Sequence, residues 1–280
     1  MTSGSSKLLP FTKMHATGSD AIVLNCLKKI PQNPQHLARK LCHRNTGIGG
    51  NQLLLLLKSK NCDFGVKVYN ADGSEAQVCG NALRCIARYV REEKLTPKKE
   101  LLLETGAGPR QVKISSKLIE VDMDEPRMKG KEIPVNLSGR IVNRPLKIDT
   151  KDFRITCLSL GTPHCVVFQE AIDTFPVTRF GPLFENHSVF PQRVNISFVN
   201  VIGKKEIHTR VWERGVGETA GCSSAASAAL VASVLNGFAD RSVTVHMPGG
   251  KIEVDWNAKD NHIILRGPAE KIFTGEFLLP

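Results

Sequence analysis

Two cysteines begin segments that are predicted to be alanine-rich helices. Cys79 follows a polar loop and precedes a predicted helix that ends near Glu93, and Cys222 begins a predicted helix that ends near Leu235. The first turn of a helix carries a partial positive charge and backbone N–H groups without helical partners, so it favours a thiolate and binds carboxylates. Two such helices around one carboxylate would place a thiol on either side of the adjacent carbon. This arrangement predicts proton removal from one face and proton return to the other, which inverts a stereocentre.

The separation of 143 residues between these cysteines recurs along the chain. The same offset relates Gly18 to Gly161, Gln52 to Asn195, Val68 to Val211, Tyr69 to Trp212, Asn70 to Glu213 and Glu75 to Glu218. A constant offset of this kind indicates an internal duplication. We therefore expect two similar domains, residues 1–123 with 268–280 and residues 124–267, each carrying one thiol.

The elements around the thiols follow from the hydrophobic pattern. Each cysteine helix is preceded by a predicted strand, 66–69 in the first half and 207–212 in the second. We expect further helices over 34–43 and 172–180, and a crossover rich in proline, glycine and polar residues over 124–144. A C-terminal strand over 271–279 is expected to return and complete the first domain.

The composition is that of a globular protein and argues against several functions. The formal charge is +11, but the basic residues are scattered in short groups and aromatic residues make up only 6%, so we expect no nucleic-acid partner. No apolar stretch approaches a membrane span, and residues 1–10, which lack a signal-peptide core, are expected to be a flexible start. The eight cysteines show no CxxC pairing, which disfavours metal, and they are expected to be reduced thiols in the cytoplasm.

Several motifs carry a resemblance to a known family. They are Asn70-Ala71-Asp72-Gly73-Ser74-Glu75 with Cys79-Gly80-Asn81, then Gly161-Thr162-Pro163-His164-Cys165, then Glu213-Arg214-Gly215-Val216-Gly217-Glu218-Thr219 with Cys222, and more loosely 13–20. In this order they resemble the diaminopimelate epimerases, from about Phe11 to the C-terminus. The resemblance implies an α+β fold of two pseudo-symmetric domains, each a curved, mostly antiparallel sheet wrapped around a central helix, with the site in the cleft between them.

The same resemblance implies a reaction and a set of site residues. The reaction is interconversion of LL- and meso-diaminopimelate in lysine biosynthesis by two-base proton transfer, without pyridoxal phosphate, metal or other cofactor, commonly in a homodimer. Cys79 and Cys222 would be the acid and base, with His164 and Glu213 near them. The substrate-binding positions would be Ser19, Gln52, Asn70, Gly80, Asn81, Thr162, Asn195, Arg214, Ser223 and Ser224. Of these, Gly80, Asn81, Ser223 and Ser224 would offer backbone donors to the reacting carboxylate.

The sequence departs from the family pattern around the substrate. Ser19 and Thr162 stand where the family has asparagine, Ser223 stands where it has glycine, and Asn51 replaces the aspartate before Gln52. These changes leave the thiol pair intact but alter the pocket. Two alternatives therefore stay open: a racemase of another amino acid with a remodelled pocket, and a non-catalytic binding protein on the same fold.

Overall fold

The computed structural model describes residues 7–279, and these divide into two compact units. The first comprises residues 7–16, 20–119 and 268–279, and the second comprises residues 17–19 and 120–267. The expected boundary lay at 123, whereas the division falls after 119, because the strand β8 (Ile119–Asp122) pairs with β17 (Ile263–Gly267) of the second unit. Of the expected flexible start, residues 1–6 lie outside the described part. Lys7–Pro10 are not a flexible segment, because they pair with Glu276–Leu279.

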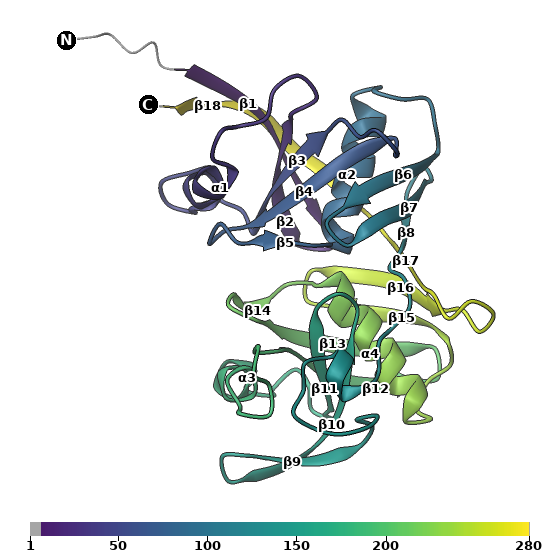
Figure 1. Ribbon diagram of the computed structural model, residues 1–280. Coiled ribbons are helices and arrows are strands. Elements are labelled where there is room, and N and C mark those ends of the chain that lie inside the picture. The colour runs from purple at the N-terminus through teal and green to yellow at the C-terminus, as the bar shows by residue number, and fades with distance from the viewer. Residues whose placement is uncertain (1–6, 280) are drawn as a thin grey trace. The chain divides into compact units, whose positions relative to one another are not determined.

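The first unit is a mostly antiparallel sheet packed on one helix, α2 (Gly80–Glu92) (Figure 1). Its elements are β1 (Lys7–Ala16), β2 (Ser19–Asn25), α1 (Pro34–Cys42), β3 (Gln52–Leu57), β4 (Phe64–Asn70), β5 (Glu75–Ala76), β6 (Glu100–Thr105), β7 (Gly108–Ile114) and β18 (Glu270–Leu279). Strands β2 and β3, and likewise β4 and β6, run parallel. The helix buries most of its side chains against β1, β3, β4, β7 and β18, which makes it the centre of this unit.

The second unit repeats this plan around the helix α4 (Ser223–Leu235) (Figure 1). Its elements are a 3-10 turn (Gly130–Glu132), β9 (Arg144–Ile148), β10 (Lys151–Ser159), β11 (Pro163–Phe168), α3 (Val177–Glu185), β12 (Asn195–Gly203), β13 (Glu206–Glu213), β14 (Gly217–Thr219), β15 (Ser242–Met247), β16 (Gly250–Trp256) and β17. The alanines of α4 are fully buried, and their small side chains let the surrounding strands approach the helix closely. The predicted α+β class, with a curved sheet around a central helix, is confirmed.

Equivalent helices and strand pairings of the two units are separated by the offset of 143 residues. Helices α1 and α3 differ by this offset at both ends, and so do α2 and α4. The parallel pairing of Ala21 with Gln52 recurs as the pairing of His164 with Asn195. The two units are therefore copies of one structure, and differences between equivalent residues mark where the copies have specialised.

One predicted helix is misplaced. We expected a helix near 172–180, but residues 172–176 form a turn and α3 begins at Val177. Pro176 explains the difference, because a proline disfavours the helical conformation in the residue before it. Pro176 instead occupies the N-cap position of α3.

Candidate active site

Both cysteines of the predicted site occupy the N-cap position of a central helix. Cys79 precedes α2 with φ −147° and ψ 114°, and Cys222 precedes α4 with φ −134° and ψ 119°. The first helical hydrogen bonds run from Leu83 N–H to the Cys79 carbonyl and from Ala226 N–H to the Cys222 carbonyl, each 3.0 Å. The backbone N–H groups of residues 80–82 and 223–225 precede these bonds, at the positive end of each helix dipole. Each unit thus combines a reduced thiol with a helix terminus suited to an anion.

Within the first unit, two predicted substrate-binding amides lie side by side. Gln52 and Asn70 face each other across the β3–β4 pairing, and Gln52 Nε2 donates to Asn70 Oδ1 at 3.1 Å. Asn70 Nδ2 in turn donates to Ser74 Oγ at 3.0 Å. The chain of hydrogen bonds fixes which atoms of each amide face outward. Asn51, the residue before Gln52, accepts from Arg44 Nη2 at 2.8 Å through its Oδ1 and so is part of a hydrogen-bond network.

The helix α2 contains a buried arginine that is not one of the predicted site residues. Arg84 is fully buried, and its Nη2 donates to Asn81 Oδ1 at 2.7 Å while its Nε donates to the Pro268 carbonyl at 3.3 Å. Burial lowers the pKa of Arg84 to about 10, although the Cys85 and Cys79 thiols act in the opposite direction. Arg84 therefore anchors the side chain of Asn81 beside Cys79. The spacing of three residues on one helix was a signal that could have revealed the pair.

In the second unit, Cys222 is grouped with two other predicted residues. Its Sγ lies 3.4 Å from Ser224 Oγ, and its thiol hydrogen-bonds to the carboxyl group of Glu213. Burial raises the pKa of Glu213, while the hydrogen bonds from Thr219 and Cys222 oppose this rise. Thr219 Oγ1 donates to Glu213 Oε1 at 2.5 Å, a contact made by the β13–β14 pairing. Thr219 was within a predicted motif, but its role as partner of Glu213 was missed.

His164 lies in the second unit as a fully buried, neutral side chain. Its Nε2 is 3.1 Å from Thr162 Oγ1, and its pairing partner on β12 is Asn195. Among the described residues, Nδ1 has no hydrogen-bond partner. Burial lowers the pKa of His164 to about 3, and the positive charge of Arg214 acts in the same direction. At neutral pH this imidazole is therefore uncharged.

The buried His164 should make the stability of the protein sensitive to acid. Its folded-state pKa of about 3 lies below the ordinary 6.5, so between these values the unfolded chain binds a proton that the folded protein does not. Stability should fall as pH drops through this window. By pH 4.5 we expect this residue to cost about 3 kcal/mol. In His164→Asn the fall in urea-unfolding free energy between pH 7 and pH 4.5 should be smaller by roughly this amount.

A surface histidine provides the control for this measurement. His36 is exposed, and His36→Asn should keep the acid sensitivity of the parent protein. An identical loss of stability in His164→Asn and in the parent would show that His164 protonates as easily in the folded state as in the unfolded one.

Arg214 and Asn195 are joined through the backbone. Asn195 Oδ1 accepts from the Arg214 N–H at 2.7 Å, and Arg214 Nη1 donates to the Gln192 carbonyl at 2.9 Å. Burial lowers the pKa of Arg214. Ser223 is buried, and its carbonyl accepts from Ser227 Oγ. Ser19 is the first residue of β2 and belongs to the second unit, like Thr162 and His164.

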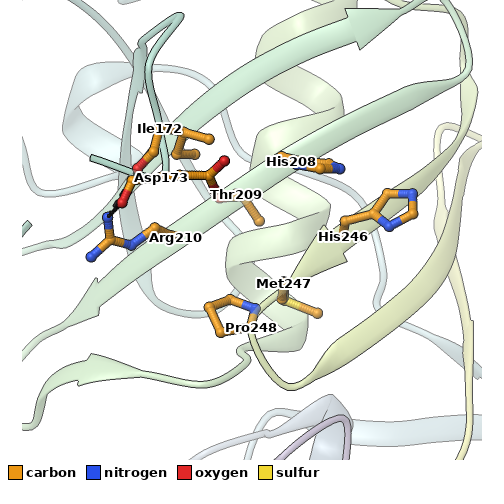
Figure 2. Close-up of a pocket in the computed structure, with 8 residues that line it drawn as sticks. All are labelled: Ile172, Asp173, His208, Thr209, Arg210, His246, Met247 and Pro248. Atoms are coloured by element: carbon orange, nitrogen blue, oxygen red, sulfur yellow. Dashed lines mark hydrogen bonds between the residues drawn. The ribbon is translucent and has the colours of Figure 1, made fainter. Parts of the chain in front are cut away.

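A separate cavity of about 400 Å³ lies in the second unit (Figure 2). It is lined by Ile172, Asp173, His208, Thr209, Arg210, His246, Met247 and Pro248, none of which is a predicted site residue. Arg210 donates to the carbonyls of Ile172 and Phe175 and to Glu218 Oε1. Through these hydrogen bonds the Arg210 guanidinium, which lies on β13, holds the loop before α3 against that strand.

No helix within residues 7–279 has both the length and the apolar character needed to cross a bilayer. In the same part of the chain, His, Cys, Asp and Glu side chains do not gather in groups of three that could hold a metal ion.

The fold belongs to a class that includes a hydroxyproline epimerase and a probable proline racemase. A probable proline racemase from Agrobacterium radiobacter K84, solved with bound carbonate, superposes with a TM-score of 0.74 over 97% of this chain and 93% of that chain, at 14% identity.

The sequence narrows this class to one family. The diaminopimelate epimerase family matches residues 11–129 and 156–272. The diaminopimelate epimerase of Acetivibrio thermocellus is 44% identical over 95% of this chain and 97% of its own length, and that of Moorella thermoacetica is 41% identical over 96% and 99%. The chain belongs to the diaminopimelate epimerase family, as the motifs predicted.

Proposed function

We propose that this protein interconverts LL- and meso-diaminopimelate by moving a proton at one α-carbon between two thiols. The observation that carries the proposal is the equivalent placement of Cys79 and Cys222, each at the N-cap of the central helix of its unit. Membership of the family supports the substrate. The reaction is an isomerisation and serves lysine biosynthesis.

The proton transfer balances without a cofactor. The thiolate of one cysteine takes the α-proton and becomes a thiol, and the thiol of the other gives its proton to the opposite face of the same carbon. The negative charge that develops on the α-carboxylate is stabilised by the backbone N–H groups at the starts of α2 and α4. Gly80, Asn81, Ser223 and Ser224 supply these groups.

Glu213 supports the proton transfer from the Cys222 side. It is hydrogen-bonded to the Cys222 thiol and to Thr219, and burial raises its pKa. A thiol that donates to this carboxyl group is held in one orientation, which positions its sulfur to take a proton from the α-carbon or to give one to it. His164 is neutral and contacts Thr162, so we propose that it shapes the polar surroundings of the site without carrying charge.

The distal amino acid end of the substrate requires a second set of contacts. We propose that Arg214 binds the distal carboxylate through its planar guanidinium, and that Asn70 and Asn195 also bind the distal amino acid end. Gln52 holds the amide of Asn70 in place by the bond at 3.1 Å. Thr162 and Ser19 take the places of two longer amides and keep hydrogen-bonding ability with a shorter reach.

A deuterium-exchange panel tests the reaction and its main rival together. The protein is incubated in heavy water with single amino acids, and uptake at Cα is followed by NMR or mass spectrometry. We expect uptake with LL- and meso-diaminopimelate and none with proline, lysine or glutamate. Strong uptake with one of these others alone would identify a racemase with a remodelled pocket, and a lack of uptake with every amino acid would favour a non-catalytic binding protein.

The assembly and the compartment are further parts of this proposal. We propose a homodimer in the cytoplasm. The eight reduced cysteines among the described residues accord with a reducing compartment. Sedimentation equilibrium would measure the assembly directly.

A further inference from the structure

Glu185 is a buried carboxylate that neither the family motifs nor the proposed reaction accounts for. It is 5% exposed and forms the last residue of α3, where the helix dipole disfavours a negative charge. Burying a charged group is costly unless hydrogen bonds and an opposite charge compensate it. The hydrogen-bond partners of Glu185 therefore indicate which part of the structure the buried carboxylate holds in place.

Three donors converge on this carboxylate from different segments. Trp212 Nε1, on β13, donates to Oε2 at 2.7 Å, while the Gly215 N–H and Arg193 Nη1 donate to Oε1 at 2.9 and 3.0 Å. Glu185 thus connects α3 to the end of β13, to the turn after β13 and to the segment before β12.

The turn held by Glu185 is the one that carries Arg214. The Gly215 N–H is bound by Glu185, and the preceding N–H, that of Arg214 itself, is bound by Asn195 Oδ1 at 2.7 Å. Two consecutive peptide groups are therefore fixed by two side-chain acceptors. Gly215 has φ +74°, a conformation that glycine adopts without strain, so the turn can follow this path. The direction in which Arg214 leaves the backbone is determined by this pair of bonds.

A close approach between Trp212 and α3 completes the arrangement. A Cβ atom added to Gly181 would lie 2.4 Å from Trp212 Cδ2, so only glycine lets the indole lie this close to the helix. This packing brings Nε1 of Trp212 to Glu185, one helical turn further along α3. The glycine inside the helix, which costs helix stability, has a packing reason.

The first unit lacks this carboxylate at the equivalent position. The residues 143 positions before Glu185 and Trp212 are Cys42 and Tyr69, and both belong to an apolar core cluster. The residue equivalent to Arg214 is Ala71. The buried carboxylate therefore occurs only in the copy that carries the arginine, although both copies share the same scaffold.

We propose that Glu185 is the positioning residue for Arg214, and that it sets the affinity of the site for the distal carboxylate of the substrate. This inference rests on the proposed function. Glu185 acts through the Gly215 N–H and also pairs with Arg193. Burial and the Arg193 charge lower the pKa of Arg214, and Glu185 opposes them.

Glu185→Gln tests the inference with almost no change of shape. In either orientation of the new amide, its NH2 group faces a donor, either the Trp212 indole or the Gly215 and Arg193 groups. We expect the KM for diaminopimelate to rise at least tenfold while kcat changes less than threefold. Adding Trp212→Phe removes the indole donor, so the double variant should regain at least threefold in KM relative to Glu185→Gln. A general loss of structure would not be repaired by this second change.

The controls separate this inference from the proposed function. Glu253 is exposed, and Glu253→Gln should keep the parental KM. A folded Glu185→Gln protein with a KM within twofold of the parent would overturn the role of Glu185 and leave the proposed reaction standing. If Glu185→Gln does not fold, Glu185→Asp, whose carboxylate reaches less far, is judged by the same KM criterion. Lack of Cα exchange in the parent itself would instead remove the proposed function.

Discussion

Replacing either Cys79 or Cys222 with serine is expected to lower the turnover of diaminopimelate at least 10³-fold. General acid–base catalysis contributes about 10²–10⁴-fold, and a serine hydroxyl is a far weaker acid and a poorer proton carrier than a thiol. Both groups are needed in every turnover, because one must be the base while the other is the acid. Their losses should therefore not multiply, and the double variant should be about as slow as either single variant.

A third cysteine provides the matched control for this experiment. Cys62 is a half-buried free thiol outside the proposed site, and Cys62→Ser should retain parental activity. Turnover is measured by conversion of LL- to meso-diaminopimelate, with circular dichroism to confirm folding. A folded Cys79→Ser protein with more than a tenth of the parental turnover would refute the two-thiol mechanism.

Replacing Arg214 with methionine is expected to reduce kcat/KM about 10²–10³-fold, mainly through KM. Loss of one member of a buried, hydrogen-bonded charge pair costs roughly 2–5 kcal/mol of binding free energy. Much of this cost arises because the other charge is left buried and unpaired. The distal carboxylate of diaminopimelate would be left without its guanidinium partner. Lysine at this position should not restore the affinity fully, because an ammonium group cannot make the same planar, two-bond contact.

An exposed arginine tests whether this effect is specific. Arg144 begins β9 at the surface, and Arg144→Met changes the net charge by the same amount. We expect its KM to match that of the parent. Equal KM values for Arg214→Met and Arg144→Met would assign the distal carboxylate to another residue.

The sequence was sufficient to predict features that depend on local pattern. The start of each central helix, the placement of Cys79 and Cys222 at those starts, and the offset of 143 residues were all predicted from nearby residue types, and the observed bounds of α2 and α4 agree with them. The prediction that α3 begins near 172 was wrong, and the cause is also local, because Pro176 disfavours a helical conformation in the residue before it. Capping, periodicity and internal repetition are encoded over short stretches, so they can be read without the fold.

The tertiary structure was needed for the partners that surround these groups. The contact of Glu213 with Thr219 depends on the β13–β14 pairing, and the bond from Gln52 to Asn70 depends on the register of β3 with β4. The three donors to Glu185 come from three segments of the chain. Such contacts depend on which distant strands pair and in what register, and no single stretch of sequence contains that information. The sequence alone therefore predicted the two thiols and their place at the helix starts, and the fold determined which side chains form hydrogen bonds around them.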